Sequence, residues 1–590
     1  ETLIDLDALA KVEDEDWIYG GSDPCPQAPD RVLIWLSRGG SDAKVLREFD
    51  LTTMSFVADG FHLPEAKSSA LWLDADTLMI CSAYGGDEHA TTSGYARTAR
   101  LLRRGQSIDD APVVGQTRAD AMAMAVAPVT RDPVGDRLWF VTIENFFSNT
   151  TMIGTREGPS QALDIPDDTR WSQRGDWIVL ARRSAWEIDN VTHPPDTVLA
   201  TPLSALLEGA PRYTALFTSS ERYAYENHWW NDEALIVYAH ENLEPRHMRF
   251  TPQADGTWAR TMVEGLPDVG IVHMRPLDDI EREQTGDLIA NTQDPITPPR
   301  LSLIERGRAP AVMKSMPPAF DAKGLRVERL EATSHDGTRV PYVQVGPADA
   351  GKNKGQAPVY MYGYGGFGLT MEASYRVGLG KLWLERGGTF ISANLRGGGE
   401  FGTPWHDAGR REGKARSHDD FAAIAQDLVA RGVTQPKRIA AEGGSNGGLL
   451  IANMLTRYPE RFGALFCTIP LIDMRRYTKL LAGASWIAEY GDPDIAEDWA
   501  FLQHISAYHT AVPGQAYPPI LIATTRKDDR VHPGHARKMA AKLQAMGYEA
   551  DFYEIAEGGH GYGKDNAQRA TFTTLGLAFL REKIGWTDET

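Results

Sequence analysis

The chain has 590 residues, of which 42% are hydrophobic and 24% charged, and it carries a formal net charge of −19. This length exceeds what one hydrophobic core supports and predicts at least two domains. The acidic charge argues against nucleic acid as a partner, because phosphate binding needs a basic surface. No stretch approaches the roughly 20 apolar residues of a membrane helix, so no membrane contact is expected.

The three cysteines, Cys25, Cys81 and Cys467, lie far apart and form no C-x-x-C pair. This pattern excludes a disulfide framework and a zinc–thiolate site. The sequence also lacks an H-E-x-x-H motif, so no metal is expected. The chain opens at Glu1 without a signal segment, which predicts a processed or truncated N-terminus. We expect a cytoplasmic protein, with the periplasm as the alternative, acting as a monomer or a small homo-oligomer.

Residues 1 to about 315 contain short apolar bursts separated by polar turns. The aspartates that open these bursts are Asp30, Asp76, Asp136, Asp176, Asp232 and Asp287. They lie between 40 and 60 residues apart, whereas propeller blades of four strands repeat at roughly 40–50 residues with insertions in loops. The pattern predicts a β-propeller of six or seven blades. A pair of large β-sandwiches is the alternative, because the spacing is uneven.

A proline-marked boundary at residues 313–318 precedes a region in which strands alternate with helices. The expected strands are residues 325–333 and 339–345, joined by an Asp-Gly turn, and then 358–361, 389–395, 438–442, 519–524 and 550–555. The expected helices are residues 417–430, with Ser417 as the N-cap, and 447–457. This alternation predicts a parallel sheet covered by helices on both faces. We therefore expect two domains, residues 1–318 and 319–590.

The run GGSNG at residues 443–447 matches the G-x-S-x-G motif between an expected strand and an expected helix. A sharp turn at this point holds the serine in a strained backbone conformation, and side chains on its neighbours would collide with the strand and helix. The serine hydroxyl then lies beside a helix N-terminus, which favours an oxyanion. The motif predicts that Ser445 is a nucleophile.

A serine hydroxyl becomes nucleophilic when a base takes its proton, so a histidine and an orienting carboxylate are expected after Ser445. Asp528 and Asp529 follow the expected strand 519–524, and His560 follows the expected strand 550–555. Both loops lie at carboxyl ends of strands, where α/β sheets collect ligands. Glycines beside His560 indicate a backbone shaped to present its ring, whereas Asp529 is interpreted as a solvated acid.

The remaining histidines of this region lack such a setting. We expect surface or packing positions for His406, His504, His509, His532 and His535, the last two of which open a helix and fit a capping role. The run GYGGFG at residues 363–368 fits the dinucleotide fingerprint G-x-G-x-x-G, which requires an acidic residue at the end of the next strand. That strand ends at residues 393–396 without an acid, so no dinucleotide cofactor is expected.

Five runs in the second half carry a family resemblance. They are YGYGGF at 362–367, NLRGGGEFG at 394–402, GGSNGGLL at 443–450, DDRV at 528–531 and GHG at 559–561. In this order they make residues 320–590 similar to the catalytic domain of the prolyl oligopeptidase family of serine peptidases. The resemblance implies a seven-bladed β-propeller that caps an α/β-hydrolase domain. The family has a helical segment before the propeller, whereas this chain is expected to begin close to the propeller.

The resemblance also implies roles for single residues. It implies a catalytic triad of Ser445, Asp528 and His560. It implies an oxyanion hole made by the backbone N–H of Asn446 and the hydroxyl of Tyr364, since a phenol can donate to developing negative charge.

Four further residues match positions that bind substrate in the family. Arg530 matches an arginine that holds a substrate backbone carbonyl, and Trp486 matches a tryptophan that stacks on the substrate proline. Phe367 and Tyr490 match other positions that line the pocket. The activity so implied is endo-acting hydrolysis of short peptides after proline through an acyl-enzyme, without a cofactor. The alternatives are an exopeptidase or a specialised isopeptidase with the same triad, and a catalytically silent propeller scaffold.

Overall fold

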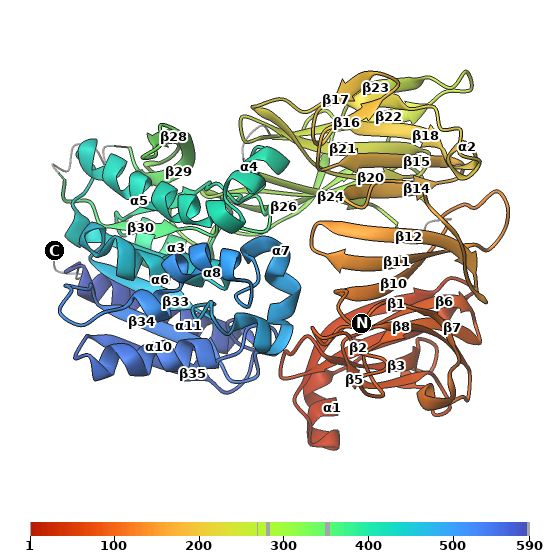
Figure 1. Cartoon of the computed structure of the whole chain (residues 1–590), viewed down its shortest axis with the longest axis horizontal. Helices are drawn as coiled ribbons and strands as arrows, with labels where there is room; N and C mark the ends of the chain where they lie inside the picture. Colours follow the sequence, from red (N-terminus) through yellow and green to blue (C-terminus); the bar gives the residue numbers. More distant parts are fainter. Residues whose placement is uncertain (1, 268–269, 279–283, 349–354, 587–590) are drawn as a thin grey trace.

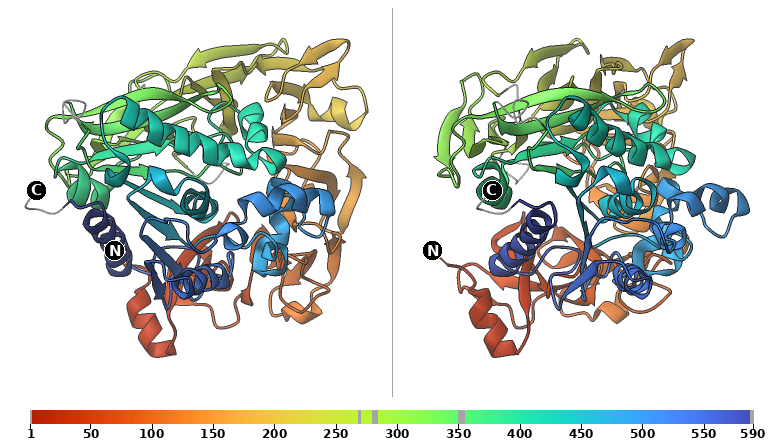
Figure 2. Two further views of the ribbon diagram at one scale, coloured as in Figure 1. Left: turned by 60° about the vertical axis from the view of Figure 1, so that its left-hand side comes forward. Right: turned by 90° about the vertical axis from the view of Figure 1, so that its left-hand side faces the viewer.

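The computed structural model describes residues 2–267, 270–278, 284–348 and 355–586. Small antiparallel sheets built from the first half of the chain lie beside one open sheet with helices, built from the second half (Figures 1 and 2). Within the described residues, no helix is both long enough and apolar enough to span a membrane.

Six antiparallel sheets follow one another through the first half of the described chain. The first, preceded by α1 (Leu6–Glu13), contains β1 (Trp17–Cys25), β2 (Ala28–Arg38), β3 (Lys44–Asp50), β4 (Ser55–Phe56) and β5 (His62–Ala66). The second contains β6 (Ser68–Asp74), β7 (Thr77–Ser82), β8 (Thr98–Arg103) and β9 (Val113–Gln116). The third contains β10 (Ala123–Pro128), β11 (Leu138–Asn145), β12 (Ser148–Thr155) and β13 (Gly158–Ala162).

The remaining three sheets repeat this pattern. The fourth contains β14 (Thr169–Arg174), β15 (Trp177–Arg182), β18 (Val198–Pro202) and β19 (Thr214–Phe217), with the small hairpin β16 (Trp186–Ile188) and β17 (Val191–His193) and helix α2 (Leu203–Leu207) inserted. The fifth contains β20 (Tyr223–Asn231), β21 (Ala234–Glu241), β22 (Glu244–Pro252) and β23 (Trp258–Met262). The sixth contains β24 (Ile271–Pro276), β25 (Leu288–Asp294), β26 (Thr297–Ile304) and β27 (Ala311–Ser315).

The aspartate-marked bursts of the sequence correspond to one strand of each blade. Asp76 precedes β7, Asp176 precedes β15 and Asp232 precedes β21, and each of these is the second strand of its sheet. These second strands are buried along most of their length, which explains their continuous apolar runs. The prediction of a β-propeller is confirmed. The described residues form six blades, and a seventh remains a prediction.

One eight-stranded sheet forms the centre of the second half, in the order β28-β29-β31-β30-β32-β33-β34-β35. Its strands are β28 (Leu325–Thr333), β29 (Arg339–Pro347), β30 (Val359–Tyr362), β31 (Thr389–Ala393), β32 (Ile439–Gly444), β33 (Ala464–Thr468), β34 (Ile520–Thr525) and β35 (Ala550–Ile555). The strands from β30 to β35 pair in parallel, whereas β28 and β29 are antiparallel. The expected parallel sheet is therefore present, with an antiparallel pair at one edge.

Helices cover both faces of this sheet, as the alternation of strands and helices predicted (Figure 2). The helices described in this half are α3 (Val377–Leu379), α4 (Thr403–Ala408), α5 (Lys414–Ala430), α6 (Asn446–Arg457), α7 (Ile487–Tyr490), α8 (Ala496–Leu502), α9 (Ala507–Thr510), α10 (Gly534–Ala545) and α11 (Asn566–Lys583). Phe421, Leu450 and Met539 of α5, α6 and α10 belong to one apolar core, and Phe572 and Leu580 of α11 belong to another. The second half is an α/β-hydrolase fold.

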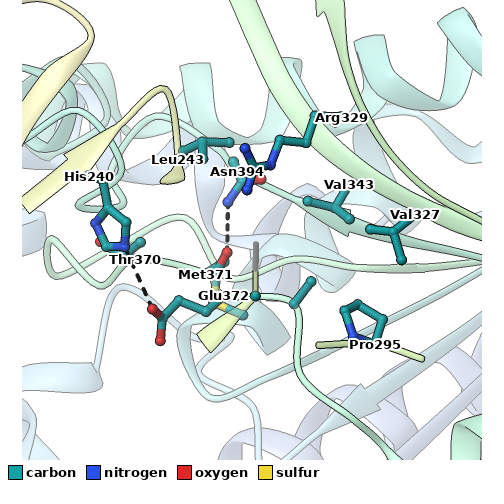
Figure 3. Close-up of a pocket in the computed structure, with 12 residues that line it drawn as sticks. His240, Leu243, Pro295, Val327, Arg329, Val343, Thr370, Met371, Glu372 and Asn394 are labelled. Atoms are coloured by element: carbon teal, nitrogen blue, oxygen red, sulfur yellow. Dashed lines mark hydrogen bonds and ion pairs between the residues drawn. The ribbon is translucent and has the colours of Figure 1, made fainter. Parts of the chain in front are cut away.

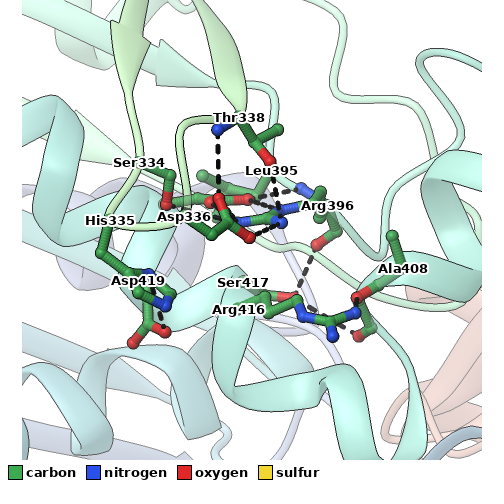
Figure 4. A network of polar contacts seen from close by, with 12 residues as sticks. Ser334, His335, Asp336, Thr338, Leu395, Arg396, Ala408, Arg416, Ser417 and Asp419 are labelled. Carbon is green, nitrogen blue, oxygen red and sulfur yellow. Dashed lines mark hydrogen bonds and ion pairs between the residues drawn. The ribbon is translucent and has the colours of Figure 1, made fainter.

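Arg396, just after β31, joins three elements of this domain (Figure 4). Its guanidinium contacts the carboxylate of Asp420 on α5 at 2.6 Å and that of Asp336 in the β28–β29 turn at 2.5 Å. Its carbonyl accepts a hydrogen bond from the hydroxyl of Ser417 at 2.6 Å. The expectation that Ser417 caps the helix is wrong, because α5 already begins at Lys414. The Ser417 hydroxyl instead fastens α5 to the end of β31.

His240 on β21 lies in the contact between the propeller and the hydrolase (Figure 3). It lines a cavity of about 40 Å³ together with Glu372 of the hydrolase. The hydroxyl of Tyr238 lies 2.7 Å from Nε2 of His240 and donates to Glu372 at 2.8 Å. Glu226 lies 3.7 Å from Nδ1 of His240. Burial alone would lower the pKa of His240, but Glu226 and Glu372 raise it to about 9.

This contact predicts a loss of stability in alkaline solution. A histidine whose pKa is raised on folding stabilises the fold fully below its unfolded pKa of about 6.5, and the contribution disappears as pH rises through the folded pKa. The thermal midpoint of the wild type should therefore fall between about pH 7 and pH 9.5, and that of His240→Gln should fall less. Differential scanning calorimetry at both pH values measures the difference.

His273 provides the control, because it also lies near Glu372, at 3.8 Å, but is exposed. His273→Gln should keep the pH dependence of the wild type. If His240→Gln lost as much stability between these pH values as the wild type, His240 would not be the group that titrates.

Candidate active site

Ser445 occupies a strained turn between β32 and α6. Its φ of 60° and ψ of −114° lie in a region that residues other than glycine rarely adopt. A Cβ on Gly443 would come within 2.4 Å of the Gly447 carbonyl oxygen, so the glycines of the motif are sterically required. The Ser445 N–H donates to the carbonyl of Thr468 at 3.0 Å, which ties the turn to β33. The turn presents the hydroxyl at the N-terminus of α6.

Asp528 and His560 meet at the carboxyl ends of β34 and β35. Oδ2 of Asp528 lies 2.7 Å from Nδ1 of His560. Oδ1 accepts the backbone N–H groups of Arg530 at 3.0 Å and Val531 at 2.9 Å. Because a carboxylate only accepts, Nδ1 of His560 carries the proton, and Nε2 is left as the nitrogen that can take one. Both carboxylate oxygens of Asp528 are thus fixed, and they fix the ring.

The loop of His560 packs against the first propeller blade. The N–H of Gly558 donates to the carbonyl of Gly39 at 2.7 Å. A Cβ on Gly559 would lie 1.8 Å from the carbonyl oxygen of Gly40, so this glycine permits close approach of the two domains. The glycines next to His560 thus do more than shape its own loop, since they make room for a turn of the propeller.

The loop of Asp528 contacts the same blade. The carboxylate of Asp529 accepts the backbone N–H groups of Asp42 at 2.9 Å and Ala43 at 3.2 Å. Its own carbonyl accepts Nζ of Lys67 at 3.2 Å. The interpretation of Asp529 as a solvated acid is therefore wrong. Its partners come from a propeller loop far away in the sequence.

Arg530 is paired with a propeller acid in this structure. Nε and one terminal nitrogen of Arg530 contact the two carboxylate oxygens of Asp42 at 2.9 and 2.8 Å. Burial disfavours the charged form of Asp42, but the hydrogen bonds from Arg530 outweigh it and lower the pKa of this carboxyl. Arg530 lies in the same loop as Asp528, and one edge of its guanidinium is already occupied by Asp42.

Tyr364, after β30, lies next to Ser445. Its hydroxyl lies close enough to the side chain of Ser445 to interact with it, and burial raises the pKa of this phenol, so it stays protonated. The Tyr364 carbonyl accepts a hydrogen bond from Nδ2 of Asn446 at 2.6 Å, and Oδ1 of Asn446 accepts one from the hydroxyl of Tyr490 at 2.7 Å. The backbone N–H of Asn446 is at the first turn of α6, where helical geometry leaves such donors without an intrahelical partner. Two hydrogen-bond donors therefore flank Ser445, one from a side chain (the Tyr364 hydroxyl) and one from the backbone (the Asn446 N–H).

The aromatic residues expected to bind substrate gather in one cluster. Trp486, at the end of the 3₁₀ helix before α7, is only 6% exposed and stacks on Tyr477 with ring centroids 6.5 Å apart. Tyr490 contacts Phe367 edge to face at 5.7 Å. Phe367 also contacts Phe146 of the propeller at 5.2 Å. The structure brings these side chains together, and Tyr490 uses its hydroxyl to hold Asn446.

Sequence reasoning missed several residues at the site or their partners. His406 takes the packing position that was one of its two expectations, and what the sequence missed is that it lies between Glu489 and Arg183. His532 does fit the expected capping role, because its Nδ1 accepts the N–H of Gly534 at 2.9 Å at the start of α10. Lys414 and Glu489 carried no local motif that could have marked them. In the described residues, no three His, Cys, Asp or Glu side chains are placed to hold a metal ion.

The fold and this arrangement of side chains define a serine hydrolase. Residues 376–587 match the prolyl oligopeptidase family. The chain is 35% identical over 595 aligned residues to an uncharacterized peptidase of Sinorhizobium fredii, covering 99% of this chain and 80% of that protein. It is 34% identical to a prolyl endopeptidase of Elizabethkingia miricola over 49% of this chain and 42% of that protein.

A solved structure, that of a post-proline cleaving enzyme from Rickettsia typhi, superimposes with a TM-score of 0.92. It is 26% identical to this chain, and the match covers 99% of this chain and 86% of that one. The chain belongs to the prolyl oligopeptidase family of serine peptidases.

Proposed function

We propose that this peptidase cleaves short peptides on the carboxyl side of proline, in the interior of the chain, with Ser445, His560 and Asp528 as its triad. The observation that carries the mechanism is the 2.7 Å contact of Asp528 with His560, and Ser445 occupies the strained turn that a nucleophilic serine requires. From the sequence we also expect a cytoplasmic protein, with the periplasm as the alternative, acting as a monomer or small homo-oligomer.

The proposed reaction follows from the protonation states of these groups. The Ser445 oxygen attacks the peptide carbonyl while its proton passes to Nε2 of His560, whose positive charge Asp528 stabilises. The carbonyl oxygen becomes an oxyanion, which accepts hydrogen bonds from the Tyr364 hydroxyl and the Asn446 N–H. Collapse breaks the C–N bond, and the amine leaves with the proton from His560. Water then hydrolyses the acyl-enzyme by the same steps.

The preference for proline is supported by the aromatic cluster and by the relatives. Trp486, Phe367 and Tyr490 lie within one group of packed rings next to Asn446. A flat, apolar surface suits the pyrrolidine ring, which has no N–H to satisfy. The similar proteins of Rickettsia typhi and Elizabethkingia miricola are described as post-proline cleaving enzyme and prolyl endopeptidase.

The acids near the triad favour internal cleavage over removal of N-terminal dipeptides. An exopeptidase needs a carboxylate to anchor the free amino terminus of its substrate. Asp42 is already paired with Arg530, and Asp529 accepts two backbone N–H groups. To bind a substrate carbonyl, Arg530 would use its remaining donors or exchange Asp42 for the peptide.

We further propose that residues 1–318 form the propeller domain and 319–590 the catalytic domain. This division is supported by the end of β27 at Ser315 and the start of β28 at Leu325. A propeller beside the triad loops would admit small or unfolded peptides and exclude folded proteins.

Three reporters test the substrate proposal. We expect an amino-blocked Gly-Pro reporter to be cleaved rapidly and a free-amine Gly-Pro reporter more slowly. A blocked Gly-Ala reporter should have a kcat/KM at least ~10-fold below that of the blocked Gly-Pro reporter, because apolar pocket contacts discriminate between substrates by about 1–3 kcal/mol. Cleavage of the free-amine form alone would establish the exopeptidase instead. If no reporter were cleaved while Ser445 still reacted with a fluorophosphonate, a specialised substrate would replace the proposal.

A further inference from the structure

A short backbone segment carries the proposed oxyanion donor and the start of the aromatic pocket. It runs from Tyr364 to Phe367, and a buried ion pair contacts it twice. Nζ of Lys414 donates to the carbonyl of Gly365 at 2.8 Å, and Oε1 of Glu489 accepts the N–H of Phe367 at 3.1 Å. Lys414 and Glu489 meet each other at 2.9 Å. The two charges therefore hold the segment on either side of its turn.

The conformation of this segment needs external support. Phe367 has a φ of 58°, in the left-handed region that residues with a side chain rarely occupy. A Cβ on Gly366 would lie 2.7 Å from Nζ of Lys414, so the ion pair and the backbone are packed without spare room. A conformation of this kind persists only when the surroundings fix it. Here Lys414 and Glu489 provide the contacts that fix the backbone of Phe367 and Gly365.

The ion pair is completely enclosed. Lys414 is 1% exposed and Glu489 is 0% exposed. Burial opposes the charged form of Glu489, but Lys414 and His406 outweigh it and lower the pKa of this carboxyl to about 2. Desolvating two charges offsets most of their attraction, so a buried ion pair contributes little to stability on its own. Its contacts with the segment 364–367 indicate a role in positioning.

A third contact connects the pair to the propeller. Arg183 donates to Nδ1 of His406 at 2.6 Å, so Nε2 carries the proton of a neutral imidazole and donates to Oε2 of Glu489 at 2.7 Å. Burial keeps the pKa of His406 below its usual value, in agreement with this assignment. Phe147 of the propeller packs on the His406 ring with centroids 4.7 Å apart. Glu489 is thus fixed from both domains.

We propose that Glu489 and Lys414 are positioning residues that hold the hydroxyl of Tyr364 at the place where the oxyanion forms. The inference rests on the proposed role of Tyr364 in the reaction. Neither charge touches the reacting atoms. Their effect reaches the substrate through the backbone between Tyr364 and Phe367.

A double-mutant cycle with Tyr364→Phe tests this inference. Removing one oxyanion donor should lower kcat on the blocked Gly-Pro reporter by about 100-fold. Glu489→Gln should lower kcat by roughly 30-fold in the presence of Tyr364, with KM changed less than about 3-fold, because a donor displaced by a fraction of an ångström serves the transition state poorly. In the Tyr364→Phe background, Glu489→Gln should cost less than about 3-fold, because the donor that it would misplace is already gone.

Control variants separate positioning from loss of fold. The double variant Lys414→Met/Glu489→Gln removes both buried charges and should keep a thermal midpoint near that of the wild type. If Glu489→Gln alone does not fold, this double variant replaces it in the cycle. Asp494→Asn breaks the exposed ion pair of Asp494 with Lys479, which measures 2.6 Å, and should leave kcat unchanged.

The possible outcomes are distinct. If Glu489→Gln lowered kcat equally with and without the Tyr364 hydroxyl, the inference would be overturned, because the loss would not pass through Tyr364. If Tyr364→Phe itself left kcat unchanged, the oxyanion assignment under the proposed function would fail instead. A variant with normal kcat but a lowered thermal midpoint would show that the ion pair is structural only.

Discussion

Ser445→Ala is expected to reduce kcat by about 10⁶-fold, as removal of a serine nucleophile does in other serine peptidases. Alanine cannot form the acyl-enzyme, and what remains is background hydrolysis in a site that still binds substrate. The fold should persist, because alanine meets the same backbone cost as serine at a φ of 60°. The measurement is hydrolysis of the blocked Gly-Pro reporter together with the thermal midpoint.

Ser204→Ala is the matched control for this variant. Ser204 is exposed at the start of α2 in the propeller, and its hydroxyl donates to Asp176 at 2.7 Å. Its loss should leave kcat at the wild-type value. Activity that survived in Ser445→Ala above the background of a mock preparation would show that another group performs the attack.

Asp528→Asn is expected to lower kcat by roughly 10⁴-fold while the protein stays folded. The geometry gives the reason. The amide oxygen of asparagine would keep the two backbone N–H groups of Arg530 and Val531, which now bind Oδ1 of Asp528. The amide nitrogen would then face Nδ1 of His560 and donate to it. The ring would be held with its proton on Nε2, where it cannot accept the proton of Ser445.

Asp529→Asn tests whether this effect is specific. Asp529 is the next residue and is also an acceptor, but its partners are backbone N–H groups of the propeller. We expect kcat to change by less than about 10-fold, because this residue acts on the contact between domains and not on the ring of His560. Equal losses in the two variants would mean that the acid of the triad has been assigned wrongly.

The catalytic half could be predicted from local sequence because each proposed triad residue lies just after a strand. Ser445 follows β32, Asp528 lies shortly after β34 and His560 shortly after β35, and parallel neighbours bring these ends to one edge. Apolar runs of strand length locate the strands, and the G-x-S-x-G spacing locates the turn. Such signals lie within a few residues of the side chains they describe.

The contacts between the domains could not be predicted in this way. Asp529 was interpreted as solvated, because its partner Asp42 is 487 residues away and a lone acid in a loop is most often exposed. His406 was placed outside the site because Arg183 and Glu489 are distant in sequence and mark no motif. Pairing of this kind depends on how the propeller is seated on the hydrolase, which a single sequence does not encode locally.

The helix boundary at Ser417 shows a smaller difficulty. Serine followed by acids is a good N-terminal signal, and it occurs here one turn inside α5. A tertiary contact explains why Ser417 does not cap the helix, because its hydroxyl donates to the carbonyl of Arg396 and α5 starts earlier, at Lys414. The side chain of Lys414 then points to Gly365 and Glu489, which no capping rule anticipates.

The central claim, that Ser445 is the nucleophile activated by His560, is tested most directly by mass spectrometry of the fluorophosphonate-treated protein. We expect a single added group on the peptide that contains Ser445, formed far more slowly in His560→Ala and absent in Ser445→Ala. A label on any other residue, or full peptidase activity in a protein whose Ser445 is labelled completely, would contradict the claim.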